Sequence, residues 1–98
     1  MNLVFSYGTL VDKFPKEKID ATLTSDLRLG SYGQYPALIK DDRIHEIHGY
    51  LLELTDKEFK EADYYEGYPD LYDRVEKELS LGYEKVKAWV YFMKKEEF

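Results

Sequence analysis

The sequence predicts an α+β domain whose sheet curls and closes into a small β-barrel of five to six strands. Most of the chain consists of short apolar or alternating segments, which are typical of β-strands and follow one another closely. One segment has a clear helical pattern with a start and a stop signal. The 98 residues suffice for one hydrophobic core, so we expect a single domain over residues 1–98.

The first part of the chain predicts a strand, a tight loop and a less regular segment. Asn2–Ser6 is a short apolar run of the strand type. Tyr7–Leu10 then places a glycine where the backbone must turn. The apolar residues of Val11–Leu23 are spaced loosely as in a helix, with Pro15 near the start. We therefore expect a short helix or an irregular turn over Val11–Leu23.

The middle of the chain predicts three strands, which are Asp26–Tyr32, Ala37–Lys40 and Ile44–Leu54. Glycine and proline between residues 33 and 36 indicate a bend after the first of them. The polar run Asp41–Arg43 indicates a turn before the last. Gly49 lies inside a strand pattern, which predicts a bulge or a close approach of another backbone.

A capping box predicts the start of the helix, because Thr55 is followed three residues later by Glu58. The helix should end at Gly67. At 3.6 residues per turn, four residues share one face: Phe59, Ala62, Asp63 and Glu66. Phe59 identifies this face as the inward one, so Glu66 should point towards the core from the last helical turn.

The last part of the chain predicts a hairpin. Tyr72–Leu79 and Lys85–Met93 both alternate, and Gly82-Tyr83 is the expected turn. If Val90 and Phe92 face the core, alternation places Trp89 and Tyr91 on the opposite side of the sheet.

Composition and motifs exclude several classes of protein. The net charge of −6 argues against a nucleic-acid partner, and no apolar run is long enough to predict a membrane span. The absence of cysteine excludes thiolate nucleophiles and fits a reducing compartment, so we expect a cytoplasmic location. The sequence has no Ser-His-Asp order, Walker loop or GxGxxG motif. Ten tyrosines suit a pocket with a few placed polar groups.

Glu66 is the strongest candidate for chemistry. Burial, the helix dipole and the like charge of Asp63 would all raise its pKa, which suits a group that exchanges protons near neutral pH. Two structural alternatives remain open at this point. Glu66 could form a buried ion pair with Arg74, or the helix end could fray and expose it.

Two other features are ambiguous from the residues alone. The amides of Tyr7–Leu10 could form an anion-binding nest, or the segment could be an ordinary turn. Tyr72 and Arg74 share a strand face close to the end of the helix, although Arg74 could serve only to fix Asp63 or Asp73.

The two histidines are a poor metal pair. His45 and His48 are three residues apart, which places them on opposite faces of a strand. A histidine that forms a hydrogen bond at a strand edge is the simpler interpretation.

An ordered set of motifs resembles the gamma-glutamylcyclotransferase-like superfamily, which includes AIG2-like and gamma-glutamylamine cyclotransferase-like proteins. The motifs are Tyr7-Gly8-Thr9-Leu10, Tyr35-Pro36-Ala37-Leu38, Asp63-Tyr64-Tyr65-Glu66-Gly67, Tyr72-Asp73-Arg74 and Ala88-Trp89-Val90-Tyr91. The resemblance implies a small mixed barrel with one or two flanking helices. It also implies that the loop of Tyr7, Gly8, Thr9 and Leu10 binds the substrate carboxylate and that Glu66 is the acid/base.

The reaction implied by this resemblance converts a gamma-glutamyl amine or amino acid into 5-oxoproline and a free amine. The substrate's own α-amine attacks its γ-carbonyl, so neither an enzyme nucleophile nor a cofactor is expected. Glu66 could take the proton from the attacking amine and return it to the leaving nitrogen. Tyr72 is a candidate for a hydrogen bond within the pocket, whereas Asp63 is expected to be structural.

The competing hypotheses are a binding module of the same fold without turnover and a protein whose tyrosines and Glu66 are all structural. The expected partner is a small gamma-glutamyl compound, with no metal, nucleic acid or membrane. The sequence leaves the leaving group and the oligomeric state open.

Overall fold

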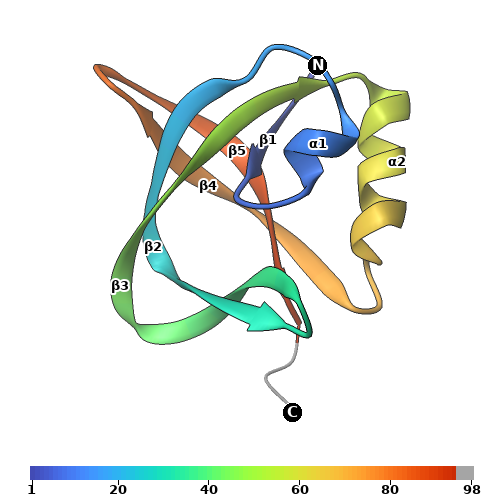
Figure 1. Ribbon diagram of the computed structural model, residues 1–98. Coiled ribbons are helices and arrows are strands. Elements are labelled where there is room, and N and C mark those ends of the chain that lie inside the picture. Colours follow the sequence, from blue (N-terminus) through green and yellow to red (C-terminus); the bar gives the residue numbers. More distant parts are fainter. Residues whose placement is uncertain (95–98) are drawn as a thin grey trace.

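The computed structural model describes residues 1–94 and contains five strands and two helices (Figure 1). The elements in chain order are β1 (Asn2–Ser6), α1 (Leu10–Lys13), β2 (Ile19–Tyr32), β3 (Tyr35–Leu54), α2 (Asp56–Glu66), β4 (Tyr72–Leu81) and β5 (Glu84–Met93). None of the helices in this part of the chain is both long and apolar enough to cross a membrane.

The five strands form a closed barrel in the order β1-β3-β2-β4-β5. The pairings β1·β3, β2·β3, β2·β4 and β4·β5 are antiparallel, and the closing pair β1·β5 is parallel. This arrangement confirms the predicted small mixed barrel with flanking helices.

Two local predictions are wrong, and both concern the long strands β2 and β3. Of the segment Val11–Leu23, which was expected to be a short helix or an irregular turn, residues 11–13 belong to α1 and residues 14–18 are irregular, but β2 already begins at Ile19. The polar run Asp41–Arg43 is not a turn, because β3 continues through it. The register changes there, since Leu27 pairs with Lys40 whereas Ser25 pairs with His45. The polar residues therefore form an irregularity that bends the strand while it stays extended.

The buried side chains form two clusters on opposite sides of the sheet. The first contains residues of all five strands and none of the helices, so it fills the barrel interior; it includes Phe5, Leu23, Leu38, Leu79 and Val90. The second joins the outer side of the barrel to the helices and includes Val4, Leu10, Leu52, Ala62 and Tyr91. As predicted, Val90 and Phe92 pack in the first cluster, and Tyr91 and Trp89 pack in the second.

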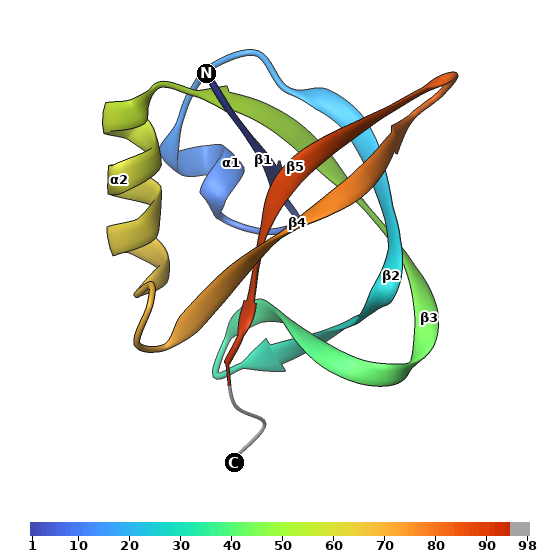
Figure 2. The same ribbon diagram turned by 180° about the vertical axis from the view of Figure 1, so that it is seen from behind.

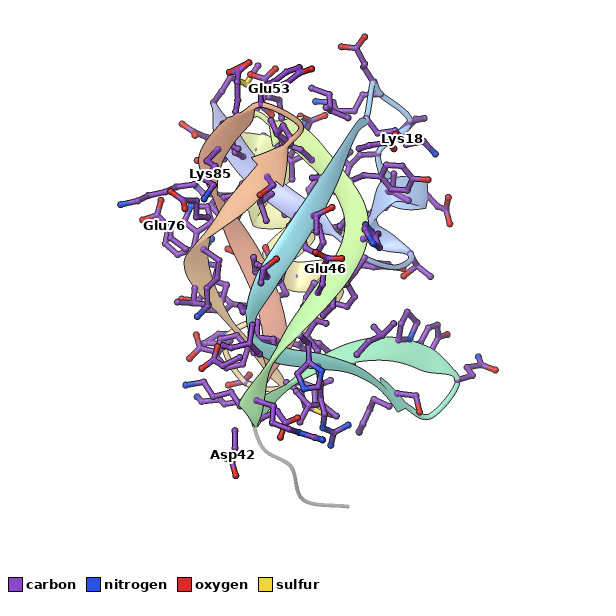
Figure 3. The ribbon with its side chains drawn as sticks, turned by 90° about the vertical axis from the view of Figure 1, so that its left-hand side faces the viewer. Lys18, Asp42, Glu46, Glu53, Glu76 and Lys85 are labelled. Atoms are coloured by element: carbon purple, nitrogen blue, oxygen red, sulfur yellow. The ribbon has the colours of Figure 1, made fainter. Side chains whose placement is uncertain are left out.

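Several charged side chains of the strands are exposed, among them those of Glu46, Glu76 and Lys85 (Figure 3). At Gly49 the backbones of β3 and β1 lie so close together that a side chain would not fit. A Cβ at this position would collide with the carbonyl oxygen of Ser6. The predicted close approach at this glycine is confirmed.

Helix α2 has the predicted start and stop. The Thr55 hydroxyl accepts from the amide of Glu58, and the Glu58 carboxylate accepts from the amide of Thr55. Gly67 ends the helix in the left-handed conformation with φ 73°. The helix lies along one side of the barrel, next to α1, in both ribbon views (Figures 1 and 2). Its C-terminal end is thereby fixed beside the turn that connects β2 and β3.

Candidate functional site

A cavity of about 360 Å³ lies where four segments meet. These are the β1–α1 loop, the β2–β3 turn, the end of α2 and the start of β4. The cavity is lined by Phe5, Ser6, Tyr7, Gly8, Thr9, Leu10, Tyr32, Tyr35, Pro36, Tyr65, Glu66, Leu71, Tyr72 and Tyr91. All six residues that the sequence singled out for the site, Tyr7 to Leu10, Glu66 and Tyr72, are therefore brought together.

The Tyr7–Leu10 loop forms one wall of this cavity. A Cβ at Gly8 would lie 2.7 Å from Cγ of Pro36, so the close packing of the loop on Pro36 requires a glycine. The Thr9 hydroxyl lies 2.6 Å from the hydroxyl of Tyr65. Within residues 1–94, the amides of Gly8, Thr9 and Leu10 donate to no turn or loop carbonyl. The loop thus offers backbone donors next to the cavity.

Glu66, the last residue of α2, lines the same cavity. Burial raises the pKa of its carboxyl from 4.5 to about 7. The predicted contribution of the Asp63 charge is not among the causes. No side chain within residues 1–94 forms an ion pair with Glu66. Burial therefore gives this carboxyl a pKa suited to proton exchange near neutral pH.

Asp63, one helical turn earlier, has the partners that Glu66 lacks. Its Oδ1 lies 3.3 Å from Nη1 of Arg74 and accepts a hydrogen bond of 2.5 Å from the hydroxyl of Tyr91. The alternative in which Arg74 pairs with Glu66 is therefore wrong, and Arg74 instead fixes Asp63. This arrangement ties α2 to β4 and β5.

The Arg74 guanidinium is held mainly by aromatic rings. Its carbon lies 4.2 Å from the ring centre of Phe59, 4.5 Å from that of Tyr68 and 4.9 Å from that of Trp89. Nε and Nη1 have no hydrogen-bond partner in the part of the chain that the structure describes. Arg74 is thus a largely covered cation whose only carboxylate contact among residues 1–94 is Asp63.

Three tyrosines surround the Glu66 carboxyl. Burial raises the pKa of Tyr7 and of Tyr72, and the charge of Glu66 raises both further. Burial and the hydrogen bond to Asp63 raise the pKa of Tyr91. The Tyr7 hydroxyl also donates to the backbone carbonyl of Tyr91 over 2.9 Å. All three phenols are therefore neutral donors at physiological pH.

Sequence reasoning missed several cavity residues. Ser6 is 1% exposed, and its hydroxyl has no partner within residues 1–94. Tyr32 and Tyr35 reach the cavity from the β2–β3 turn, and Tyr65 reaches it from the end of α2. The sequence feature that could have identified these tyrosines is their position: two of them flank the Gly33 turn, and the third precedes Glu66.

The histidines lie outside the cavity and have separate partners. His45 Nε2 lies 2.6 Å from Oδ2 of Asp41, and His48 Nδ1 lies 3.1 Å from the Thr22 hydroxyl. These contacts agree with the interpretation of histidines that form separate hydrogen bonds.

The family described as "Gamma-glutamyl cyclotransferase, AIG2-like" has a sequence model that matches residues 4–98. The chain belongs to this family. It is also 31% identical over 101 residues to a provisionally assigned gamma-glutamylcyclotransferase of Methanocaldococcus jannaschii. That alignment covers 94% of this chain and 84% of the archaeal protein. The family and the archaeal relative support a gamma-glutamylcyclotransferase-like activity in general terms.

Solved structures of the same fold come from plants and animals. A solution structure of an Arabidopsis thaliana protein has a TM-score of 0.77 at 23% identity and covers 99% of this chain and 71% of its own. The crystal structure of an AIG2-like protein from Mus musculus has a TM-score of 0.75 at 19% identity, with coverages of 96% and 78%. At these identities the comparison supports the fold alone.

Proposed function

We propose that the chain is a cofactor-independent gamma-glutamyl cyclotransferase that releases 5-oxoproline and a free amine from a gamma-glutamyl amine or amino acid. The observation that carries this proposal is that two features line one cavity. The Tyr7–Leu10 loop offers backbone amides, and Glu66 offers a carboxyl of pKa about 7.

The loop has the role of binding and orienting the substrate. The amides of Gly8, Thr9 and Leu10 hold the α-carboxylate of the glutamyl group, as successive backbone donors in a loop do for anions. The α-amine then lies close to the γ-carbonyl, to which four bonds connect it within the same molecule. Most of the gain comes from orientation, because attack within one molecule avoids the entropy of bringing two reactants together.

Glu66 has the role of moving the proton. As a carboxylate it accepts a proton from the α-amine, while the nitrogen forms a bond to the carbon of the γ-carbonyl group. It then donates that proton to the leaving nitrogen as the original amide bond breaks. The proton and the electron pairs balance within the substrate and Glu66, so the reaction needs neither water nor an oxidant.

Tyr72 has the role of a hydrogen-bond donor to the polar group that forms during the attack. It is buried in the cavity wall, and its raised pKa keeps it protonated. A neutral phenol suits the oxyanion that develops on the γ-carbonyl oxygen, because it supplies a dipole without a competing charge.

The test is a panel of gamma-glutamyl amides, with 5-oxoproline measured as the product. We expect turnover of at least one member and a fall in kcat of roughly 10²–10⁴-fold in Glu66→Gln, the range of a lost acid/base. Glu61→Gln is the matched control, because Glu61 is exposed on the same helix. Full activity in Glu66→Gln would rule out its role.

The alternative function is a binding module without turnover, and the same panel separates the two. Calorimetry that detects tight binding of a gamma-glutamyl compound, together with recovery of that compound unaltered, would support the binding module. Accumulation of 5-oxoproline at enzyme-dependent rates would exclude it.

A further inference from the structure

The cavity has a buried end and an open end of different chemistry. Tyr72 and Tyr91 at the buried end are 5% and 1% exposed. Tyr32, Tyr35 and Tyr65 are 43%, 52% and 44% exposed. These three residues, which we call the tyrosine rim, come from both sides of the β2–β3 turn and from the end of α2. The rim is thus an accessible aromatic surface next to Glu66.

One rim residue is fixed in place by its neighbours. The Tyr65 hydroxyl lies 2.6 Å from that of Thr9, which belongs to the loop proposed to hold the substrate carboxylate. The Lys13 ammonium lies 5.5 Å from the centre of the Tyr65 ring. A positioned aromatic ring contributes apolar contact area with little loss of side-chain entropy.

The charge of the cavity sets a second constraint. No lysine, arginine or histidine is among the lining residues within the described range 1–94, and Glu66 is the ionisable acid there. The substrate's α-carboxylate has the loop amides as its proposed partner. A second carboxylate on the leaving group would have no cation in the lining and would be repelled by ionised Glu66.

We propose that the leaving group is an amine with an aromatic or apolar body and no carboxylate, which the tyrosine rim binds. This inference rests on the proposed function, because it assigns the open end of the cavity to the group that leaves. If the α-carboxylate lies on the Tyr7–Leu10 loop and the reacting atoms lie at Glu66, the exposed lining that remains consists of the tyrosine rim and the apolar side chain of Leu71. The cavity therefore discriminates against gamma-glutamyl amino acids, because the amino acid that they release carries a carboxylate.

Matched pairs of substrates test the two constraints separately. Gamma-glutamyl-tyramine and gamma-glutamyl-tyrosine differ only in the carboxylate of the leaving group. Gamma-glutamyl-phenethylamine and gamma-glutamyl-ethylamine differ only in the aromatic ring. We expect kcat/KM to be higher by roughly tenfold or more for the tyramine compound, since an unpaired carboxylate is costly to desolvate. We expect a preference of roughly tenfold for the phenethyl over the ethyl compound, from apolar contact with the rim.

The outcomes separate this inference from the function on which it rests. Equal or reversed kcat/KM in both pairs, with 5-oxoproline formed, would overturn the inference and leave the cyclotransferase in place. Absence of 5-oxoproline from all four compounds would overturn both. The two expected preferences together would support both.

Variants at the rim locate the preference. In the double variant Tyr32→Ala, Tyr35→Ala we expect the phenethyl-to-ethyl ratio of kcat/KM to fall towards one, mainly through KM. Tyr83→Ala is the matched control, because Tyr83 is a fully exposed tyrosine at the β4–β5 turn and does not line the cavity. An unchanged ratio in the rim variant, or an equal change in the control, would overturn the assignment to the rim.

Lys13 is tested as the nearby cation. We expect Lys13→Gln to leave the ratio of tyramine to tyrosine compound unchanged, because Lys13 contacts the ring of Tyr65 without lining the cavity. A selective loss of activity on gamma-glutamyl-tyrosine would show that Lys13 binds the leaving carboxylate. That result would overturn the proposed discrimination.

Discussion

Asp63 and Glu66 carry the same functional group one turn apart on α2, but their surroundings are opposite. Asp63 contacts a guanidinium and accepts a hydrogen bond from a phenol. Glu66 faces the cavity without an ion-pair partner in residues 1–94, and burial raises its pKa to about 7. The difference shows how a helix face can combine an architectural carboxylate with one whose pKa is raised towards neutrality.

The two roles depend on each other through geometry. The ion pair of Asp63 with Arg74 and its hydrogen bond with Tyr91 hold the last turns of α2 against β4 and β5. The same two strands supply Tyr72 and Tyr91 to the cavity. Glu66 is therefore positioned by contacts that it does not make itself, which leaves its carboxyl free to exchange a proton.

The largest effect is expected when Asp63 loses its charged partner. Arg74→Met removes the cation and leaves Asp63, with a side chain 20% exposed, without a charged partner. We expect the free energy of unfolding to fall by about 3 kcal/mol, the lower end of the range for broken buried pairs, because about one-fifth of each side chain is exposed. Urea unfolding measures it, and Lys85→Met is the control because the Lys85–Glu78 pair at 3.9 Å is exposed. A loss below about 1 kcal/mol would mean that the pair is not structural.

The pH dependence of stability tests the raised pKa of Glu66, the carboxyl without an ion-pair partner. The unfolded chain releases the Glu66 proton near pH 4.5, and the folded protein releases it near pH 7. Between these values the unfolded state binds fewer protons, so the free energy of unfolding falls as pH rises. The variant Glu66→Gln does not lose stability in this way. Its free energy of unfolding, relative to that of the unmodified protein, should therefore rise by about 2–3 kcal/mol between pH 5 and pH 8. Unfolding curves of both proteins across that range measure the gain; a constant difference would refute the raised pKa.

A smaller effect separates the two partners of Asp63. Tyr91→Phe removes the hydroxyl that donates to Asp63 but keeps the buried ring. We expect a loss of about 2 kcal/mol, because the acceptor is a carboxylate. Thermal unfolding measures this loss, and the double variant with Arg74→Met should lose less than the sum of the single changes. Strict additivity would mean that the two contacts act independently.

Much of the fold was predictable because its signals are local. The capping box and Gly67 define α2, and its phase placed Asp63 and Glu66 on the inward face. The errors arose where the signal was weak or distant. The start of β2 alternates through Ala21, Leu23 and Ser25, but an alanine and a serine are weak markers of a buried face. The irregularity after Lys40 depends on pairing with β2, which no property of the polar run itself reveals.

The candidate site was predictable to a similar extent. The phase of α2 identified Glu66 as inward-facing, and the Gly8 loop was recognised as a possible anion nest. The sequence did not identify the ion-pair partner of Arg74. The connection between α2 and β4 is short, so Asp63, Asp73 and Glu66 could all lie close to Arg74. The tyrosine rim was missed because Tyr32 and Tyr35 reach the cavity only through the pairing of β2 with β3.

The smallest effect is expected for two buried hydroxyl groups, one with a hydrogen-bond partner and one without. Ser25 accepts a hydrogen bond from the amide of Leu27 over 3.2 Å, whereas the buried hydroxyl of Ser6 has no partner within residues 1–94. Ser6→Ala should therefore raise the free energy of unfolding by about 1 kcal/mol, and Ser25→Ala should lower it by about 1 kcal/mol. Chemical unfolding of the ligand-free protein measures both changes. Opposite signs would show that a missing partner at the cavity costs stability; a loss in Ser6→Ala would mean that its hydroxyl is already satisfied.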